Sequence, residues 1–318
     1  MTRPADSVID FVTDAPVTGS LDVQWIHGAR SRRTANEPLI QVHHVDEHTV
    51  IMRQSKLTSY EAPFLFLLFG NDRALLLDTG ATKEPGKLPL RATIDELIAT
   101  WLARHPHESY QLVVAHTHGH GDHVAGDVQF AGRPDTVVVD RDLAAVQHHF
   151  GFTTWPDQQV SFDLGGRVLA VIASPGHHRA AISIFDPWTG FLLTGDTVLP
   201  GRVYVDDPPQ LLSTLDTLVA FAGQHQVTRV LGCHIEMTTR PGRDYPLGCT
   251  YQPDEPPLQL TVTQLTSVRD AVRSVASRPG RHVFPDFVIF NPTRTAVAKL
   301  IMTGLVWKLT HSFGRRSP

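Results

Sequence analysis

The 318-residue sequence contains only two cysteines, Cys233 and Cys249, so a framework of several disulfides is excluded. It has no long hydrophobic run, because the longest, residues 63–69, is far too short to cross a bilayer. It also lacks the basic excess that a nucleic-acid-binding surface needs, since the formal net charge is −4. The N-terminus lacks the apolar segment of a signal peptide. These absences predict a cytoplasmic protein that binds neither nucleic acid nor a membrane, and they leave a homo-oligomer open.

The sequence does contain enough apolar material for a sizeable core, since hydrophobic residues make up 42% of it. Short apolar runs typical of strands alternate with amphipathic segments typical of helices, and we find neither an internal repeat nor a linker. This pattern predicts an α/β layered body in one domain.

Local signals predict where individual elements begin and end. Gly70-Asn71-Asp72 between two apolar runs predicts a β-hairpin turn. Capping-box patterns predict helix starts at Thr93 and at Thr261. Residues 282–290 predict one strand, whereas residues 293–309 fit either a helix or a strand.

The most unusual stretch is HTHGHGDH, residues 116–123, which gathers four histidines and an aspartate directly after an apolar strand. Residues i and i+2 of an extended segment point the same way, so His118 and His120 can hold one ion. Asp122 and His123 lie beyond the turn and can face a second ion. The intervening glycines allow a tight turn. Imidazole and carboxylate ligands suit Zn²⁺, and also Fe or Mn.

Other metal-type residues follow predicted strands further along the chain. They are Asp78 in LLLDTG, His177 in SPGHH, Asp196 in LLTGDT and His234 in LGCH. Such convergence of strand ends is how α/β folds build sites. Together with H-x-H-x-D-H, the order and spacing of these motifs over about residues 60–240 resemble the metallo-β-lactamase superfamily.

The resemblance implies an α/β fold, an αββα sandwich of two mixed β-sheets flanked by helices. We expect one such domain over residues 1–318, with extensions at about 1–40 and 245–318. The resemblance also implies two Zn²⁺ ions per chain that share a hydroxide nucleophile. The implied ligands form two sets joined by a bridging carboxylate: His118, His120 and His177; Asp122, His123 and His234; and Asp196 as the bridge.

Within this scheme Asp122 and Asp196 are the implied catalytic residues, because Asp122 could also orient the hydroxide. Asp78 is expected to orient a ligand histidine, with a turn cap as the alternative, and His116 to contact or pack beside the cluster. Cys233 is predicted to be a buried apolar residue. Five loop residues could bind a substrate carboxylate, polarise a carbonyl or be solvated surface: Arg202, Tyr204, Arg240, Arg243 and Tyr245.

At two positions the sequence differs from particular subfamilies of the superfamily, and these differences restrict the activities that we expect. His120 stands where flavodiiron-type oxidoreductases have Glu, and Asp196 stands where true β-lactamases have Cys or Ser or lack the bridge. The combination resembles glyoxalase II and the acyl-homoserine lactonases, which implies hydrolysis of a small-molecule ester, thioester or lactone. The alternatives are a mononuclear-iron enzyme resembling the persulfide dioxygenases, a phosphodiesterase, and a binding module. A glutathione thioester is disfavoured, because the C-terminal tail carries basic residues only sparsely.

Overall fold

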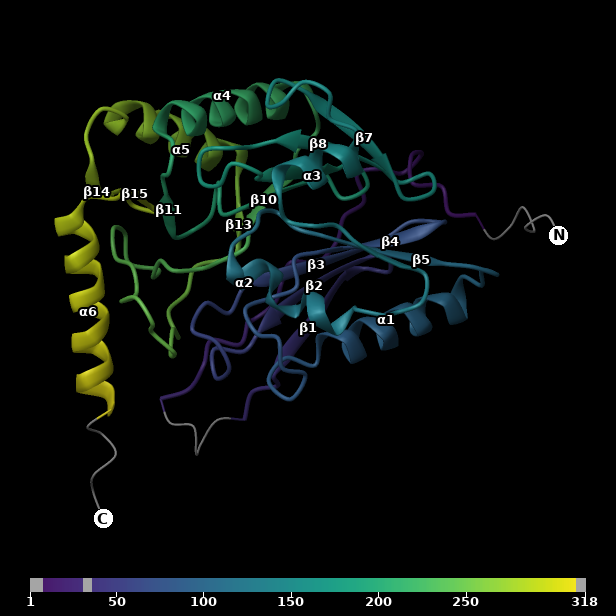
Figure 1. The fold of residues 1–318 in the computed structure, drawn as a ribbon, viewed down its shortest axis with the longest axis horizontal. Coiled ribbons are helices and arrows are strands. Elements are labelled where there is room, and N and C mark those ends of the chain that lie inside the picture. Colours follow the sequence, from purple (N-terminus) through teal and green to yellow (C-terminus); the bar gives the residue numbers. More distant parts are fainter. Residues whose placement is uncertain (1–7, 31–35, 313–318) are drawn as a thin grey trace, which may run out of the picture.

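Two six-stranded sheets lie face to face in the structure, a computed structural model that describes residues 8–30 and 36–312 (Figure 1). Strands one to four of the first sheet pair antiparallel, and strands four to six pair parallel. The first sheet runs in chain order: β1 (Ile40–Asp46), β2 (Thr49–Gln54), β3 (Phe64–Phe69), β4 (Arg73–Leu77), β5 (Gln111–Ala115) and β6 (Thr136–Val138).

The second sheet is also mixed, with one parallel pair, β10 and β12, among antiparallel neighbours. Its order is β13 (Gln259–Leu260), β12 (Arg229–Gly232), β10 (Phe191–Gly195), β9 (Ile182–Asp186), β8 (Val168–Ala173) and β7 (Gln159–Asp163). A small third sheet contains β11 (Arg202–Tyr204), β15 (Val288–Asn291) and β14 (Gly280–Val283).

Helices cover the outer faces of the two large sheets (Figure 1). Helix α1 (Leu90–Arg104) covers the first sheet, and α4 (Pro208–Gln224) and α5 (Val262–Val275) cover the second. The remaining helices are α2 (Gly121–Val124), which continues into a 3₁₀ turn (Ala125–Gln129), α3 (Leu143–Phe150) and α6 (Arg294–Ser312). No helix within the described ranges combines the length and apolarity that a bilayer crossing requires.

Strand β3 illustrates why the layers form. Successive side chains of a strand point to opposite faces. Phe64, Phe66 and Leu68 accordingly pack in the core between the sheets, whereas Leu65 and Leu67 pack in the core beneath α1. A strand that is apolar at every position needs cover on both sides, and the second sheet and α1 provide it. The predicted αββα sandwich is confirmed.

The capping-box prediction was right at Thr261 and wrong at Thr93. Thr261 accepts a hydrogen bond from the Gln264 backbone, and the Gln264 side chain accepts one from the Thr261 N–H. Helix α1 instead begins three residues before Thr93, at Leu90. The Thr93 hydroxyl donates to the Pro89 carbonyl 2.9 Å away, so it is engaged inside the first turn and caps nothing.

The C-terminal region also differs from expectation. Residues 282–290 do not form one strand, because the chain reverses between β14 and β15, where Phe284 N–H donates to the Phe287 carbonyl. Pro285 lies inside this turn, where its missing N–H is not needed by the sheet. The segment that fitted either helix or strand is helix α6.

A buried guanidinium links the two sheets. Arg167, directly before β8, makes two contacts with Asp186 of β9, at 3.0 Å from Nε and 2.6 Å from Nη2. Its Nη1 also donates to two carbonyls of the first sheet, that of His48 in the turn before β2 and that of Phe69 at the end of β3. Both side chains of the pair are about 1% exposed. Because every contact is buried, neither charge has water as an alternative partner.

We expect Arg167→Met to destabilise the protein by about 3–5 kcal/mol, because it leaves the Asp186 carboxylate buried without its cation. Urea unfolding followed by circular dichroism measures the change. The double variant Arg167→Met/Asp186→Asn removes the stranded charge and should be more stable than the single variant. Equal stability of the two variants would show that the lost carbonyl contacts, and not the buried charge, dominate.

Candidate metal centre

The predicted ligands lie on segments that follow strands of both large sheets. His118, His120, Asp122 and His123 follow β5, and three others follow the second sheet's strands β8, β10 and β12. Parallel pairing places the carboxyl ends of β4 and β5, and of β10 and β12, at common edges. The two sheets therefore bring these segments together at one end of the sandwich.

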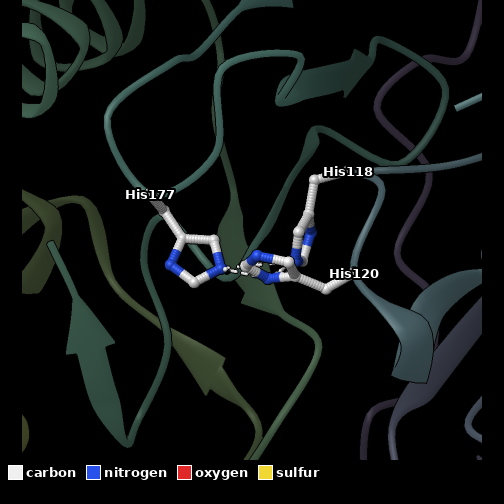
Figure 2. A group of neighbouring side chains, drawn as sticks. All are labelled: His118, His120 and His177. Carbon is white, nitrogen blue, oxygen red and sulfur yellow. Dashed lines mark hydrogen bonds between the residues drawn. The ribbon is translucent and has the colours of Figure 1, made fainter. Parts of the chain in front are cut away.

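His118, His120 and His177 turn their ring nitrogens toward a common point (Figure 2). His118 Nε2 lies 2.9 Å from His120 Nδ1, and His177 Nε2 lies 3.2 Å and 3.1 Å from those two atoms. Three nitrogens at about 2.0–2.1 Å from a tetrahedral zinc lie roughly 3.3 Å apart, close to this spacing. Three converging imidazoles offer more lone pairs than protons can satisfy, so the set fits a cation.

The surroundings orient His177 and lower the pKa values of His118 and His120. His177 Nδ1 donates to the Tyr204 carbonyl at 2.9 Å, which leaves the Nε2 lone pair facing the cluster. Burial lowers the pKa of His118 well below its ordinary value, and the neighbouring histidines lower it further. Burial and the charge of His177 likewise lower the pKa of His120. Neutral imidazole is the form that binds metal.

The second set contains Asp122, His123, His234 and Asp196. Asp122 Oδ2 lies 3.3 Å from His234 Nε2 and 3.5 Å from His123 Nε2. The other ring nitrogens are occupied: His123 Nδ1 lies 2.9 Å from Asp78 Oδ2, and His234 Nδ1 lies 3.1 Å from the Glu61 carbonyl. Each ring therefore presents Nε2 to the cluster.

Asp196 lies between the two sets. Its Oδ2 is 3.7 Å from His177 Nε2 of the first set and 3.6 Å from His123 Nε2 of the second. Its Oδ1 is buried, lies 3.5 Å from His234 Nε2 and has no hydrogen-bond partner among the described residues. A buried carboxylate oxygen without a donor is costly unless a cation faces it. This atom is the clearest local evidence that the cluster fits metal.

The charges of the second set support the same interpretation. Burial alone would lower the pKa of His234, but Asp196 and Asp122 outweigh it and raise that pKa to about 9. Burial also opposes protonation of His123, yet Asp78 and Asp196 raise its pKa well above the ordinary value. The carboxylates thus attract positive charge, which protons or metal ions can supply in competition.

Asp78 and His116 lie beside the ligand sets without belonging to either. Asp78 accepts from the Thr117 backbone N–H at 2.7 Å in addition to its contact with His123, so it fixes both the turn and a ring. His116 Nε2 lies 2.8 Å from Asp127 Oδ1 and does not join either set. Cys233 is buried, as predicted, with its thiol 3.2 Å from Asp78 Oδ2. Burial raises the pKa of that thiol well above its ordinary value.

A cavity of about 370 Å³ opens onto both sets. Five of the predicted ligands line it, together with Arg202 and Tyr204. Glu236 follows His234 by two positions, and this spacing could have identified it. Sequence reasoning missed the other new lining residues because they come from loops with no motif. The lining residues missed from the sequence are Tyr60, Glu61, Leu199, Asp206, Glu236 and Leu247.

Arg202 lines this cavity, but its guanidinium is already paired. Its Nη2 lies 2.6 Å from Glu236, its Nη1 lies 2.7 Å from Asp244, and its Nε donates to the Tyr204 hydroxyl at 3.2 Å. It therefore has little capacity left for a substrate carboxylate. Burial raises the pKa of Tyr204, as does Glu236, so the phenol stays protonated.

The three remaining predicted substrate residues lie elsewhere. Arg240 and Arg243 line a separate hollow beside Asp254, and Tyr245 does not line the metal cavity. The Tyr245 hydroxyl accepts a hydrogen bond from the Asp254 backbone at 2.7 Å.

A separate group contains Glu47, His48 and His105, which are residue types of a metal site. The position of the proton on the His48 ring, however, prevents that ring from binding a metal. The Trp101 indole donates to His48 Nδ1 at 3.1 Å. The neutral ring must then carry its proton on Nε2 and has no lone pair left for a metal. A larger hollow of about 950 Å³ lies between residues 16–27 and the second sheet, but the described residues form no such group of ligands there. Size alone therefore does not mark the site.

The chain is similar to several known proteins. A hydroxyacylglutathione hydrolase from Synechococcus sp. (strain JA-3-3Ab) is 30% identical over 163 residues, which cover 50% of this chain and 62% of that protein. Another, from Synechococcus sp. (strain JA-2-3B'a(2-13)), is 28% identical over 222 residues, covering 69% of this chain and 80% of that protein. The solved structure of a metallo-beta-lactamase from Pontibacter korlensis is 18% identical, covers 74% of this chain and 99% of its own, and has a TM-score of 0.45.

The family assignment follows from a family model that matches more than half of the chain. The family model of the metallo-beta-lactamase superfamily matches residues 62–234, more than half of the chain and a range that includes every residue of both ligand sets. The chain belongs to the metallo-beta-lactamase superfamily.

Proposed function

We propose that this protein is a dinuclear zinc hydrolase that cleaves a small-molecule ester, thioester or lactone. The observation that carries the proposal is the pair of ligand sets that share Asp196 beside a cavity of about 370 Å³. The cavity is large enough for a small molecule and adjoins both sets. The relatives named hydroxyacylglutathione hydrolases support a thioester within this class.

The donor atoms fit two borderline-to-hard cations. Nitrogen and carboxylate ligands without thiolate suit Zn²⁺, and Fe or Mn are the alternatives. Two such ions, when bound, lower the pKa of water toward about 7 and polarise a substrate carbonyl. The proposed ligands are His118, His120 and His177 for one ion, Asp122, His123 and His234 for the other, and Asp196 for both.

Residues outside the ligand sets would position the substrate and the ligands. The Tyr204 hydroxyl accepts from Arg202 Nε, which leaves its own proton free to donate to a substrate oxygen. The Tyr204 carbonyl meanwhile fixes His177, and the Glu61 carbonyl fixes His234. Both residues line the cavity. Tyr204 and Glu61 would therefore each form part of the cavity wall and orient a ligand ring.

Away from the ligand sets, whose carboxylates the bound cations would offset, the charge of the cavity wall favours a neutral or cationic carrier over an anionic one. Besides the ligand carboxylates, Glu61, Asp206 and Glu236 line it. Arg202 is the only Lys or Arg in this lining within the described residues, and Glu236 and Asp244 neutralise it. A glutathione carrier brings carboxylates of its own, which this lining would repel. We therefore propose a carrier without net negative charge.

Asp196→Ala should lower kcat/KM roughly 100-fold or more, because losing a mere outer-shell partner already costs about 10–100-fold. Metal content should fall below two ions per chain, as measured by inductively coupled plasma mass spectrometry. Asp196→Asn keeps the shape and should lose less metal than Ala. Asp140→Ala, at an exposed aspartate, is the matched control. Two bound zinc ions and full turnover in Asp196→Ala would refute the bridge, and one iron with oxygen uptake in the wild type would favour the dioxygenase.

Replacing His177 or His234 by Ala should empty different sites, because each residue closes a different set. The expected result is one retained ion in each variant, at positions distinguishable by anomalous scattering. Loss of the same ion from both variants would show that the division into two sets is wrong.

Asp206→Asn should raise kcat/KM for an anionic thioester relative to a cationic one by about three- to fivefold at low salt, as expected for one charge at the cavity edge. The paired substrates are thioesters of one acyl group with 2-mercaptoethanesulfonate and with thiocholine. Dividing the variant's ratio by that of the wild type cancels their intrinsic reactivities. Asp207→Asn is the control, because Asp207 caps α4 and does not line the cavity. An unchanged ratio in Asp206→Asn would remove the electrostatic argument.

A further inference from the structure

Helix α6 is the last described element and lies against the edge of the body (Figure 1). Gly304 is the only buried residue among its described side chains. A Cβ at Gly304 would lie 2.4 Å from the Leu247 carbonyl, so the helix backbone packs directly on that loop. Leu300 and Trp307 beside it are half-buried. One narrow stripe therefore holds α6, and the opposite side faces outward.

The outward side is apolar. It contains six large residues, each between 37% and 58% exposed. At about 100° per residue they form one continuous band over half of the helix surface. Soluble monomers rarely expose so many adjoining apolar side chains without a partner. The band consists of Val297, Ile301, Met302, Leu305, Val306 and Leu309.

The charge of this segment is opposite to that of the rest of the chain. Residues 294–318 contain five basic and no acidic residues, whereas residues 1–293 contain 23 basic and 32 acidic ones. On helical geometry Lys299 falls at one border of the apolar band, and Lys308 falls near the other, where its ammonium lies 5.9 Å from the centre of the Tyr60 ring. An apolar face bordered by lysines is typical of a helix that lies in the plane of a membrane surface.

We propose that α6 docks the protein on an anionic lipid surface, with its apolar band in the boundary between headgroups and acyl chains. Charge complementarity selects this partner. A second copy of α6 would oppose basic groups to basic groups, whereas anionic headgroups complement them. Docking in the plane requires no bilayer crossing.

The test is cosedimentation of the full-length protein with vesicles at low salt. Wild type should bind phosphatidylcholine–phosphatidylglycerol vesicles more tightly than pure phosphatidylcholine vesicles. Salt should weaken the binding, since each basic group near an anionic surface contributes a factor of about five. The triple variant Ile301→Gln/Leu305→Gln/Leu309→Gln should lower the partition coefficient at least about tenfold.

Val168→Gln is the matched control, because Val168 is also an exposed apolar residue but lies on β8, and it should bind as wild type does. Circular dichroism and light scattering of each variant report folding and oligomeric state. Absence of wild-type binding to anionic vesicles, or unchanged binding by the folded triple variant, would overturn the proposal. A wild-type dimer that binds no vesicles and becomes monomeric in the triple variant would identify a second copy as the partner instead.

Discussion

The candidate centre depends on the need to compensate one buried carboxylate. Asp196 directly follows β10 of the second sheet, and its charge lies among side chains with little access to water. Such a charge is stable only if cations or donors surround it. The histidines of residues 118–123 can compensate this charge only if the two sheets pack against each other in one fixed position. The packing between the sheets and the Arg167 contacts between them therefore fix the distances on which the centre depends.

Ligand orientation is coupled to the shape of the cavity. The carbonyls that hold His177 and His234 belong to Tyr204 and Glu61, whose residues also line the cavity. A backbone shift in either loop would change the cavity wall and a ring orientation together. Asp78 differs, because it is fully buried and the hydrogen bonds of its side chain to described residues go to the turn after β5 and to Cys233. Its substitution should alter the ligands without altering the cavity wall.

The fold and the grouping of the candidate ligands were predictable from the sequence, but most of the remaining cavity lining was not. Local spacing indicates the candidate ligands, since the H-x-H-x-D-H pattern requires only that alternate side chains point the same way and that a turn follows. The neutralisation of Arg202 depends on Glu236 and Asp244, which lie 34 and 42 positions away and meet it only in the folded chain. At Thr93 a local pattern misled the prediction. The capping-box pattern is present there, but the helix begins three residues earlier, directly after Pro89.

The acidic cavity and the basic helix α6 are neighbours, so they cannot be considered separately. Leu247 lines the cavity and supports the helix at Gly304. The Lys308 ammonium lies 5.9 Å from the centre of the Tyr60 ring, which also lines the cavity. A cation over an aromatic face is stabilised by the ring and partly offsets the acidic lining nearby. Any partner that draws Lys308 toward anionic headgroups would remove that cation from Tyr60. The cavity wall near Tyr60 would then become more acidic and would repel anionic substrates more strongly.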